Sequence, residues 1–282
     1  MNRYWTSLMA KFLLLTISII SVLPFIILVS GSITDEQELL TYLGGALEIG
    51  NETNLVLFPS FPTLRGYVKL LLDTPEFYVV FWNSVKITVF ITLGQLLIAV
   101  PAAWGFSRWH GKISSILFYA YTILMLLPFQ VTMLSGYIVL DRLKLLDTHS
   151  ALILPAIFST FPIFIMYRFF SEIPSETIEA FSLDSNSRLL LFRHIAIPLA
   201  MPGIKASILL GVVEYWNMIE QPLIYIKTAS LWPFSVYLPQ MSTDSVQYIF
   251  VFSFLVLVPM LLVTVWGKDD LESGIGTMIV RK

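Results

Sequence analysis

Six long apolar runs are the feature of this sequence that most constrains its fold. Each run is near or above the roughly 20 residues with which an α-helix crosses the hydrocarbon core of a bilayer, about 30 Å. The apolar residues form continuous runs instead of the periodic stripes of a surface helix. The sequence therefore predicts an all-α integral membrane protein with six transmembrane helices, over residues 12–31, 79–104, 113–140, 150–170, 203–226 and 248–266.

The composition agrees with a membrane protein and excludes several other classes. Of 282 residues, 56% are hydrophobic and 13% are charged, and the mean hydropathy is +0.79. A soluble domain carries about 25% charged residues. Because the chain has no cysteine and only three widely spaced histidines, a disulfide framework, a thiolate site and a histidine metal centre are not expected. A net charge of −2 gives no reason to expect nucleic acid as a partner.

The basic residues predict the orientation of the chain. The first run is preceded by Arg3 and Lys11, as in a signal peptide, but it is too long, and residues 30–32 are a weak cleavage site. Lys and Arg concentrate in cytoplasmic connections. With a cytoplasmic N-terminus, eleven basic residues fall inside and five outside, with Lys86 unassigned. Both termini are therefore expected in the cytoplasm.

The connections divide the expected chain into four parts. Residues 1–31 are an N-terminal segment with the first helix, and residues 32–78 are an extracytoplasmic loop. Residues 79–270 are a core of five helices with a cytoplasmic loop over 172–202, and residues 271–282 are a cytoplasmic tail. The loop over 32–78 is acidic and contains three prolines, so we expect a small ordered cap. It is either simply solvated or a docking surface for an external partner.

A polar block over residues 176–202 interrupts the apolar sequence between the fourth and fifth spans. Pro174 suits the first turn of a helix that Ser171 or Ser175 could cap. Turn-forming residues over 182–187 should end that helix, and a second segment should end at Pro198. We expect a helix–turn–helix whose large side chains are available to a partner or rest on lipid: Ile178, Phe181, Leu183, Phe192 and Ile195.

This block carries a resemblance to a known family. Glu179-Ala180, followed by Asp184, Phe192, Ile195, Ile197, Pro198 and Pro202, resembles the EAA loop of importer permeases in the ATP-binding cassette (ABC) superfamily. More narrowly, the chain resembles the carbohydrate-uptake branch that includes the maltose permeases. Further landmarks of that branch are Asn83-Ser84, Pro128-Phe129-Gln130-Val131-Thr132, Leu145-Leu146-Asp147-Thr148, residues 151–155, Trp216-Asn217 and residues 271–275. The resemblance implies a type I importer permease fold in a prokaryotic plasma membrane.

The resemblance also implies a mechanical role for the block and a set of partners. Its first helix would be a coupling helix in a cleft of a cytoplasmic ATPase, with Glu179 as the polar anchor and Ala180 allowing close approach. Asp184 and Ser185 would follow at the turn, Phe192 and Ile195 would brace the second segment, and Pro198 would fix its exit. The implied partners are a second permease subunit, an ATPase dimer and an extracytoplasmic binding protein for a sugar or oligosaccharide.

Two positions depart from the family pattern. Phe181 stands where a second alanine is usual, and Ser185 replaces a glycine that can take positive φ. Asn186 is the next best residue for that conformation, so either the turn is shifted or the partner's cleft differs. The sequence has no G-x-x-x-x-G-K-[ST] phosphate loop. The chain is thus expected to be non-catalytic and to bind no cofactor, with ATP and Mg on the partner ATPase.

Polar residues inside the spans mark a second candidate site. A carboxylate at mid-bilayer depth costs several kcal/mol, so Glu214 and Glu220, expected within the fifth helix, should face the bundle interior or water. Helical spacing places Glu214, Asn217 and Gln221 on one stripe, and Trp216 adds an aromatic surface that suits a sugar. The alternatives are a polar network that fastens helices, or a Glu220 that is wet near the outer surface.

Other polar residues and the prolines of the spans have structural interpretations. Gln95 and Gln130 are expected to form hydrogen bonds between helices. Pro128, Pro155 and Pro162 are expected to bend or interrupt their spans.

Two other functions are compatible with a pair of intramembrane glutamates. A proton-coupled secondary transporter would use Glu214 and Glu220, but that class commonly shows internal repeats, and we find no convincing repeat here. An intramembrane enzyme on lipid-linked sugar would need two converging carboxylates. Six residues apart on one helix, these two would point in different directions.

Overall fold

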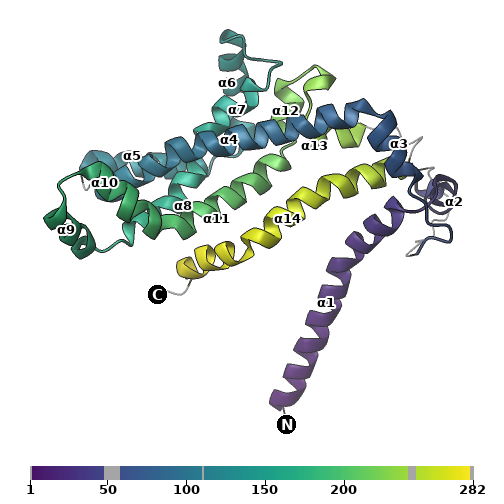
Figure 1. Ribbon diagram of the computed structural model, residues 1–282, viewed down its shortest axis with the longest axis horizontal. Coiled ribbons are helices and arrows are strands. Elements are labelled where there is room, and N and C mark those ends of the chain that lie inside the picture. Colours follow the sequence, from purple (N-terminus) through teal and green to yellow (C-terminus); the bar gives the residue numbers. More distant parts are fainter. Residues whose placement is uncertain (1, 48–57, 110, 241–245, 280–282) are drawn as a thin grey trace. The chain divides into compact units, whose positions relative to one another are not determined.

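The structure, a computed structural model, describes residues 2–47, 58–109, 111–240 and 246–279, and they are mostly helical (Figure 1). Within these ranges no extended strand occurs, apart from one isolated bridge between Thr34 and Pro62. The α-helices are α1 (Asn2–Ser32), α2 (Glu36–Leu47), α3 (Arg65–Asp73), α4 (Pro75–Arg108), α5 (Lys112–Met125), α6 (Phe129–Arg142), α7 (Ser150–Ile157), α8 (Thr160–Ser171), α9 (Ser175–Asp184), α10 (Arg188–Leu191), α11 (Ile197–Trp216), α12 (Glu220–Tyr225), α13 (Phe234–Tyr237) and α14 (Val246–Ile279).

The candidate membrane spans confirm the predicted fold class. Among the described residues, five helical segments are long and apolar enough to cross a membrane, and a bent pair raises the number to six. The segments are Leu8–Ser32, Pro75–Arg108, Ser150–Ser171, Arg188–Trp216 and Val246–Asp270, and the bent pair is Lys112–Met125 with Phe129–Arg142. The chain is therefore an all-α membrane protein, as its apolar runs predict.

The third predicted span is not one helix. α5 and α6 meet at a 102° bend, so a continuous helix over 113–140 is wrong, whereas the expected interruption at Pro128 is confirmed. Pro128 has no N–H to continue the helical ladder, and its ψ of 146° starts α6 in a new direction. The fourth span is likewise interrupted, at Phe158 and Ser159 between α7 and α8.

The chain divides into two compact units. The first contains the described residues up to Tyr78 together with those of Leu238–Val258. Within it, Gln247 Nε2 donates to Thr34 O at 2.7 Å, and Tyr67 Oη donates to Ser32 Oγ at 2.7 Å. Ser60 and Phe61 N–H groups donate to the Glu38 carboxylate, and these bonds lower the pKa of Glu38. The part of the 32–78 loop that the structure describes thus has its own helices, α2 and α3.

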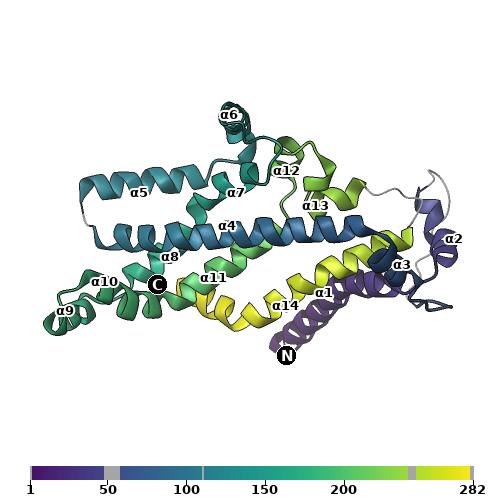
Figure 2. The ribbon, with the colours of Figure 1, turned by 45° about the horizontal axis from the view of Figure 1, so that its top comes forward.

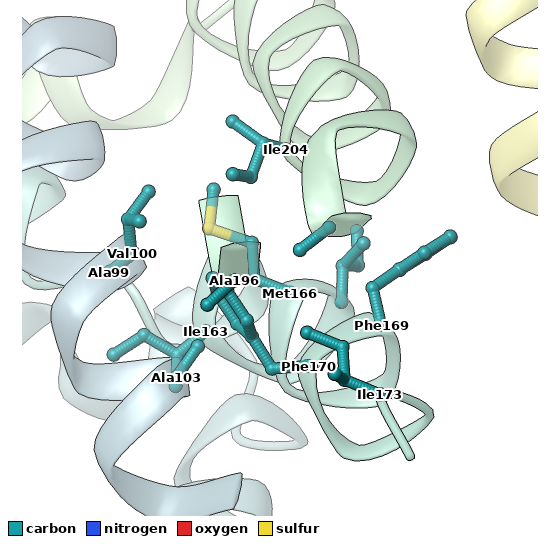
Figure 3. Packing of buried hydrophobic residues seen from close by; sticks show 12 residues of the cluster. Ala99, Val100, Ala103, Ile163, Met166, Phe169, Phe170, Ile173, Ala196 and Ile204 are labelled. Atoms are coloured by element: carbon teal, nitrogen blue, oxygen red, sulfur yellow. The ribbon is translucent and has the colours of Figure 1, made fainter. Parts of the chain in front are cut away.

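The second unit contains Val79–Tyr237 and the residues from Pro259 onward, and it holds both candidate sites. One of its cores joins α4 and α8 to the start of α11, with the side chain of Met166 extending toward Ile204 (Figure 3). α8 packs along α11, and at Gly203 of α11 a Cβ would overlap the Phe169 ring. α5 packs on the last turns of α4 through ring contacts that include Phe106 and Phe118 (Figure 2).

Gln95 fastens the middle of this unit. Its Nε2 donates to Ala156 O at 2.8 Å and to Tyr215 Oη at 2.7 Å, so one buried amide joins α4, α7 and α11. Gln130 of α6 donates to Glu220 Oε1 of α12 at 2.7 Å. Both glutamines therefore form the interhelical hydrogen bonds that the sequence predicts.

Candidate functional site

The polar block folds as a short helix, a turn and a longer helix. α9 and α10 lie beside each other at one end of the second unit (Figures 1 and 2). Pro174 is the residue before α9, with Glu176 in the first turn, where a carboxylate complements the positive end of the helix. No side chain caps α9, so the expected capping by Ser171 or Ser175 is wrong.

The turn between α9 and α10 does not use left-handed backbone. Ser185 is extended, with φ −154° and ψ 130°, and its N–H donates to Phe181 O. Asn186 is not among the residues with positive φ, so the alternative of a glycine-like turn shifted to Asn186 is wrong. Ser187 precedes α10 and caps it, because its hydroxyl accepts a hydrogen bond from Leu190 N–H at 3.4 Å. An extended serine therefore replaces the glycine of the family pattern.

The second segment of the block does not end at Pro198. α10 passes into a π-helical turn over Phe192–Ala196 and then directly into α11. Proline has no N–H to donate, and within this turn the N–H of Ile197 reaches Phe192 O, five residues back. This register shift lets the chain stay helical through Pro198 and Pro202. The block is therefore continuous with the span that carries Glu214.

Side chains of the block divide into an exposed set and a packed set. Glu179, Ala180 and Asp184 are exposed, and Leu183 is 90% exposed. Phe192 instead packs on the core, with its ring 6.0 Å from that of Trp104 and 6.4 Å from that of Phe170. Ile178 packs against the same core, whereas Ser185 and Ile195 are half-buried and Pro198 is exposed. The exposed residues are available to a partner, and Phe192 joins the block to the bundle.

Arg108 adds a connection that sequence reasoning missed. One guanidinium nitrogen donates to Phe170 O at 2.6 Å and to Ile173 O at 3.2 Å, and the group lies 4.7 Å from the Trp104 ring centroid. These bonds hold carbonyls at the end of α8, just before α9, against the end of α4. In the sequence, Arg108 counts only as a cytoplasmic charge at the end of an apolar run.

The predicted polar stripe on the fifth helix does not form. α11 ends at Trp216, and residues 217–219 separate it from α12. Asn217 turns its side chain back to Val213 O at 2.9 Å, while Glu220 and Gln221 belong to the first turn of α12. A stripe of Glu214, Asn217 and Gln221 on one helix is therefore wrong, as is placing Glu220 within the same helix as Glu214.

Trp216 and Glu214 face different surroundings. Trp216 is 6% exposed, and its ring packs against Phe81 and Phe234. It lines an apolar groove of about 360 Å³ between α4, α11 and α14. Glu214 is exposed and lines another cavity, of about 430 Å³, with residues at the α5–α6 break and the α7–α8 break. The structure thus separates the expected aromatic surface from the carboxylate.

A network at the opposite end of the unit from α9 fixes the connection after α12 (Figure 2). Asp147 has a φ of 58°, and its carboxylate accepts hydrogen bonds from Lys227 N–H, Thr228 N–H and Thr228 Oγ1. Asn83 Nδ2 donates to the carbonyls of Ser230 and Trp232. In the sequence, Asn83 and Asp147 are only landmarks of the resemblance. In the structure, both hold the connection after α12 in place by hydrogen bonds.

Comparison with known proteins establishes the class of this chain. It belongs to the family of inner membrane components of binding-protein-dependent transport systems, whose pattern matches residues 95–271. It is therefore a permease subunit of an ABC importer, a multi-pass protein of the inner membrane. The secondary transporter and the intramembrane enzyme are set aside.

Individual relatives cover most of the chain. Protein LplC of Bacillus subtilis is 32% identical over 223 residues, which are 79% of this chain and 71% of that protein. The polygalacturonan/rhamnogalacturonan transport system permease protein YtcP of Bacillus subtilis is 30% identical over 241 residues, 85% of this chain and 78% of that protein. The fold is similar to a crystal structure of a bacterial ABC transporter that imports the acidic polysaccharide alginate, with a TM-score of 0.80, 19% identity and coverage of 94% and 96% of the two chains.

Proposed function

We propose that this subunit passes a sugar or oligosaccharide across the membrane and that residues 176–202 couple this passage to ATP hydrolysis on a separate subunit. The observation that carries the coupling role is the continuity of the block with the bundle. α9 presents exposed Glu179, Ala180 and Asp184, and the chain then runs as one helix from Arg188 to Trp216. A displacement of α9 would therefore pass through the short turn over 185–187 and then along one continuous helix to α11.

Three contacts would carry the same displacement to the neighbouring helices. Phe192 contacts Trp104 of α4 and Phe170 of α8, and Arg108 binds the carbonyls that precede α9. Packed side chains in a dense core transmit movement because there is little free volume to absorb it. Closing of the ATPase pair would thus move α4, α8 and α11 together and switch the side of the membrane to which the path is open.

The proposed assembly contains a second permease subunit, an ATPase dimer that holds ATP and Mg, and an extracytoplasmic solute-binding protein. Both termini lie in the cytoplasm in this arrangement, because the basic residues then concentrate on the inside. This chain itself binds no cofactor. The similarity to YtcP, a polygalacturonan/rhamnogalacturonan permease, supports a saccharide as the solute.

Charge reversal at α9 tests the coupling role. In the complete complex, Glu179→Lys should abolish solute-stimulated ATP hydrolysis while the chain still inserts, because a cation replaces the polar anchor. Asp269→Lys is the matched control, since Asp269 is an exposed carboxylate of α14 outside the block. Normal coupling in Glu179→Lys, or equal loss in both variants, would contradict the assignment.

A further inference from the structure

The cavity beside Glu214 forms where membrane spans are broken. Leu124, Met125 and Leu127 line it from the break between α5 and α6, and residues 158–161 line it from the break between α7 and α8. Its volume of about 430 Å³ lies within the roughly 300–1,000 Å³ of small-molecule sites. Irregular backbone at membrane depth occurs where it is buried in protein or lines a water-filled cavity. We therefore expect these two breaks to face protein or water and not lipid.

Glu214 gives this cavity a charge. Its side chain is exposed, whereas the next residues, Tyr215 and Trp216, are 7% and 6% exposed. A carboxylate within a span avoids lipid and faces water or a polar partner. Glu220 accepts a hydrogen bond from Gln130, but within the described part of the chain no group donates to Glu214. Its oxygens are thus available to a solute or to water.

The remaining lining of the cavity suits a polyol. Ser159 and Thr160 contribute hydroxyl groups beside the carboxylate, and Phe158 and Phe161 contribute aromatic surface. The eight residues that line it include one ionisable side chain, Glu214, and no Lys, Arg or His. An ionised carboxylate only accepts hydrogen bonds, and sugar hydroxyls can donate to it. An anionic group, by contrast, finds no cation in this lining.

We propose that this cavity is a water-filled section of the solute path, and that Glu214 makes it selective for uncharged oligosaccharides over uronates and sugar phosphates. The proposal rests on the proposed function of sugar import and names the charge class of the solute. Two like charges roughly 8 Å apart, at an effective dielectric constant of about 20, would repel enough to lower occupancy roughly thirtyfold. This chain would therefore differ from YtcP, a polygalacturonan/rhamnogalacturonan permease, and from the importer of the acidic polysaccharide alginate.

Cysteine labelling measures the charge and the water accessibility of the cavity, and it does not require the solute to be known. The chain has no cysteine, so Thr160→Cys, or Ser159→Cys as a second variant, introduces a single thiol. In the complete complex, its modification by a cationic and by an anionic methanethiosulfonate reagent is followed on this subunit by mass spectrometry. The rate with the cationic reagent is divided by the rate with the anionic reagent, and this ratio is divided by the same ratio for a small free thiol. The result should be about ten or more.

Glu214→Gln should reduce that preference to near unity, because the amide keeps the shape of the side chain and removes its charge. Glu76→Gln, which removes an exposed carboxylate from the start of α4, should leave the preference unchanged. If neither cysteine variant reacts with either reagent, the cavity is inaccessible to water and the proposal is overturned. A preference for the anion, or one that survives Glu214→Gln, would do the same.

The solute class is tested with two oligosaccharide series of equal length, neutral and uronic, added with the binding protein to the complex. Stimulation of ATP hydrolysis by the neutral series alone is the expected result. Stimulation by the uronic series, or by neither, overturns the proposal. The coupling role is tested separately, because Glu179→Lys interrupts stimulation by any solute, whereas Glu214→Gln should extend stimulation to uronic solutes.

Discussion

A single residue, Asp147, anchors the chain segment that follows α12. Its backbone lies in the left-handed region, which Asp and Asn enter more readily than most residues. That conformation accompanies the three hydrogen bonds from residues 227 and 228, and the N–H of Asp147 donates to Tyr225 O at 2.8 Å. One residue thereby ties the α6–α7 connection to the connection after α12.

The charge of Asp147 makes this tie dependent on pH. Hydrogen bonds from the Thr228 side chain and N–H, aided by Lys227, hold the pKa of Asp147 below its usual value of about 3.9. A carboxyl whose pKa is lower in the folded state stabilises the fold above its unfolded pKa, and this contribution disappears as pH falls through the folded pKa.

Two substitutions of Asp147 separate its charge from its backbone conformation. At pH 7 the melting temperature of the purified complex should fall in the order wild type, Asp147→Asn, Asp147→Ala, because asparagine keeps the left-handed preference and alanine loses both contributions. Acidification below about pH 4 should narrow the gap between wild type and Asp147→Asn. Equal melting temperatures for all three proteins at pH 7 would refute the role of this residue.

At the scale of elements, the second unit depends on the close contact of α8 with α11. Gly203 allows this contact, because a Cβ there would overlap the Phe169 ring. Gly105 of α4 is the opposite case, since, apart from its own helix, no atom of the described residues lies within 4 Å of the position of its Cβ. The two glycines share a helical setting and differ in their surroundings.

Alanine substitution should therefore affect the two glycines in opposite ways. Gly203→Ala should destabilise the protein by about 1–3 kcal/mol through overpacking. Gly105→Ala should be neutral or stabilising by up to about 1 kcal/mol, because alanine is the better helix former. Thermal unfolding in detergent measures both. Comparable destabilisation by the two substitutions would contradict the packing account.

The positions where the helices begin and end show which sequence features predict this structure and which do not. Long apolar runs identify the spans because membrane crossing imposes a minimum length. Prolines identify one break correctly, at Pro128, and mislead at Pro198, where a π-helical turn absorbs the missing donor. The end of α11 at Trp216 has no proline to signal it. Helical spacing therefore suggested a polar stripe that the chain interrupts.

The candidate sites were predictable to different degrees for a physical reason. The coupling block consists of residues that are contiguous in sequence, so a local pattern identifies it. Arg108 and Asp147 act through partners about 60 to 80 residues away, and only the fold brings these partners together. Glu214 was identified by the cost of its burial in a membrane, but its cavity depends on two helix breaks far from it in sequence.

At the scale of the whole molecule, the first transmembrane helix shows how much apolar surface its own unit leaves uncovered among the described residues. The most apolar window of α1 is 0% buried, although its mean hydropathy is 2.9. Lipid is as apolar as these side chains, so exposure to a bilayer costs little, and a second subunit could cover them by close packing. An apolar helix of this kind is suited to a bilayer or to a neighbouring membrane subunit.

The most direct test of the account asks what α9 touches in the complete complex. In one variant the photo-crosslinking residue p-benzoylphenylalanine replaces Leu183, which lies beside Asp184 and is 90% exposed. In the control variant the same residue replaces Leu64, which lies before α3 and is 65% exposed. Irradiation at position 183 should capture a subunit whose peptides contain a phosphate loop, and irradiation at position 64 should not. Capture of lipid alone at position 183, or of the same ATPase from both positions, would contradict the proposal that this block is moved by an ATPase.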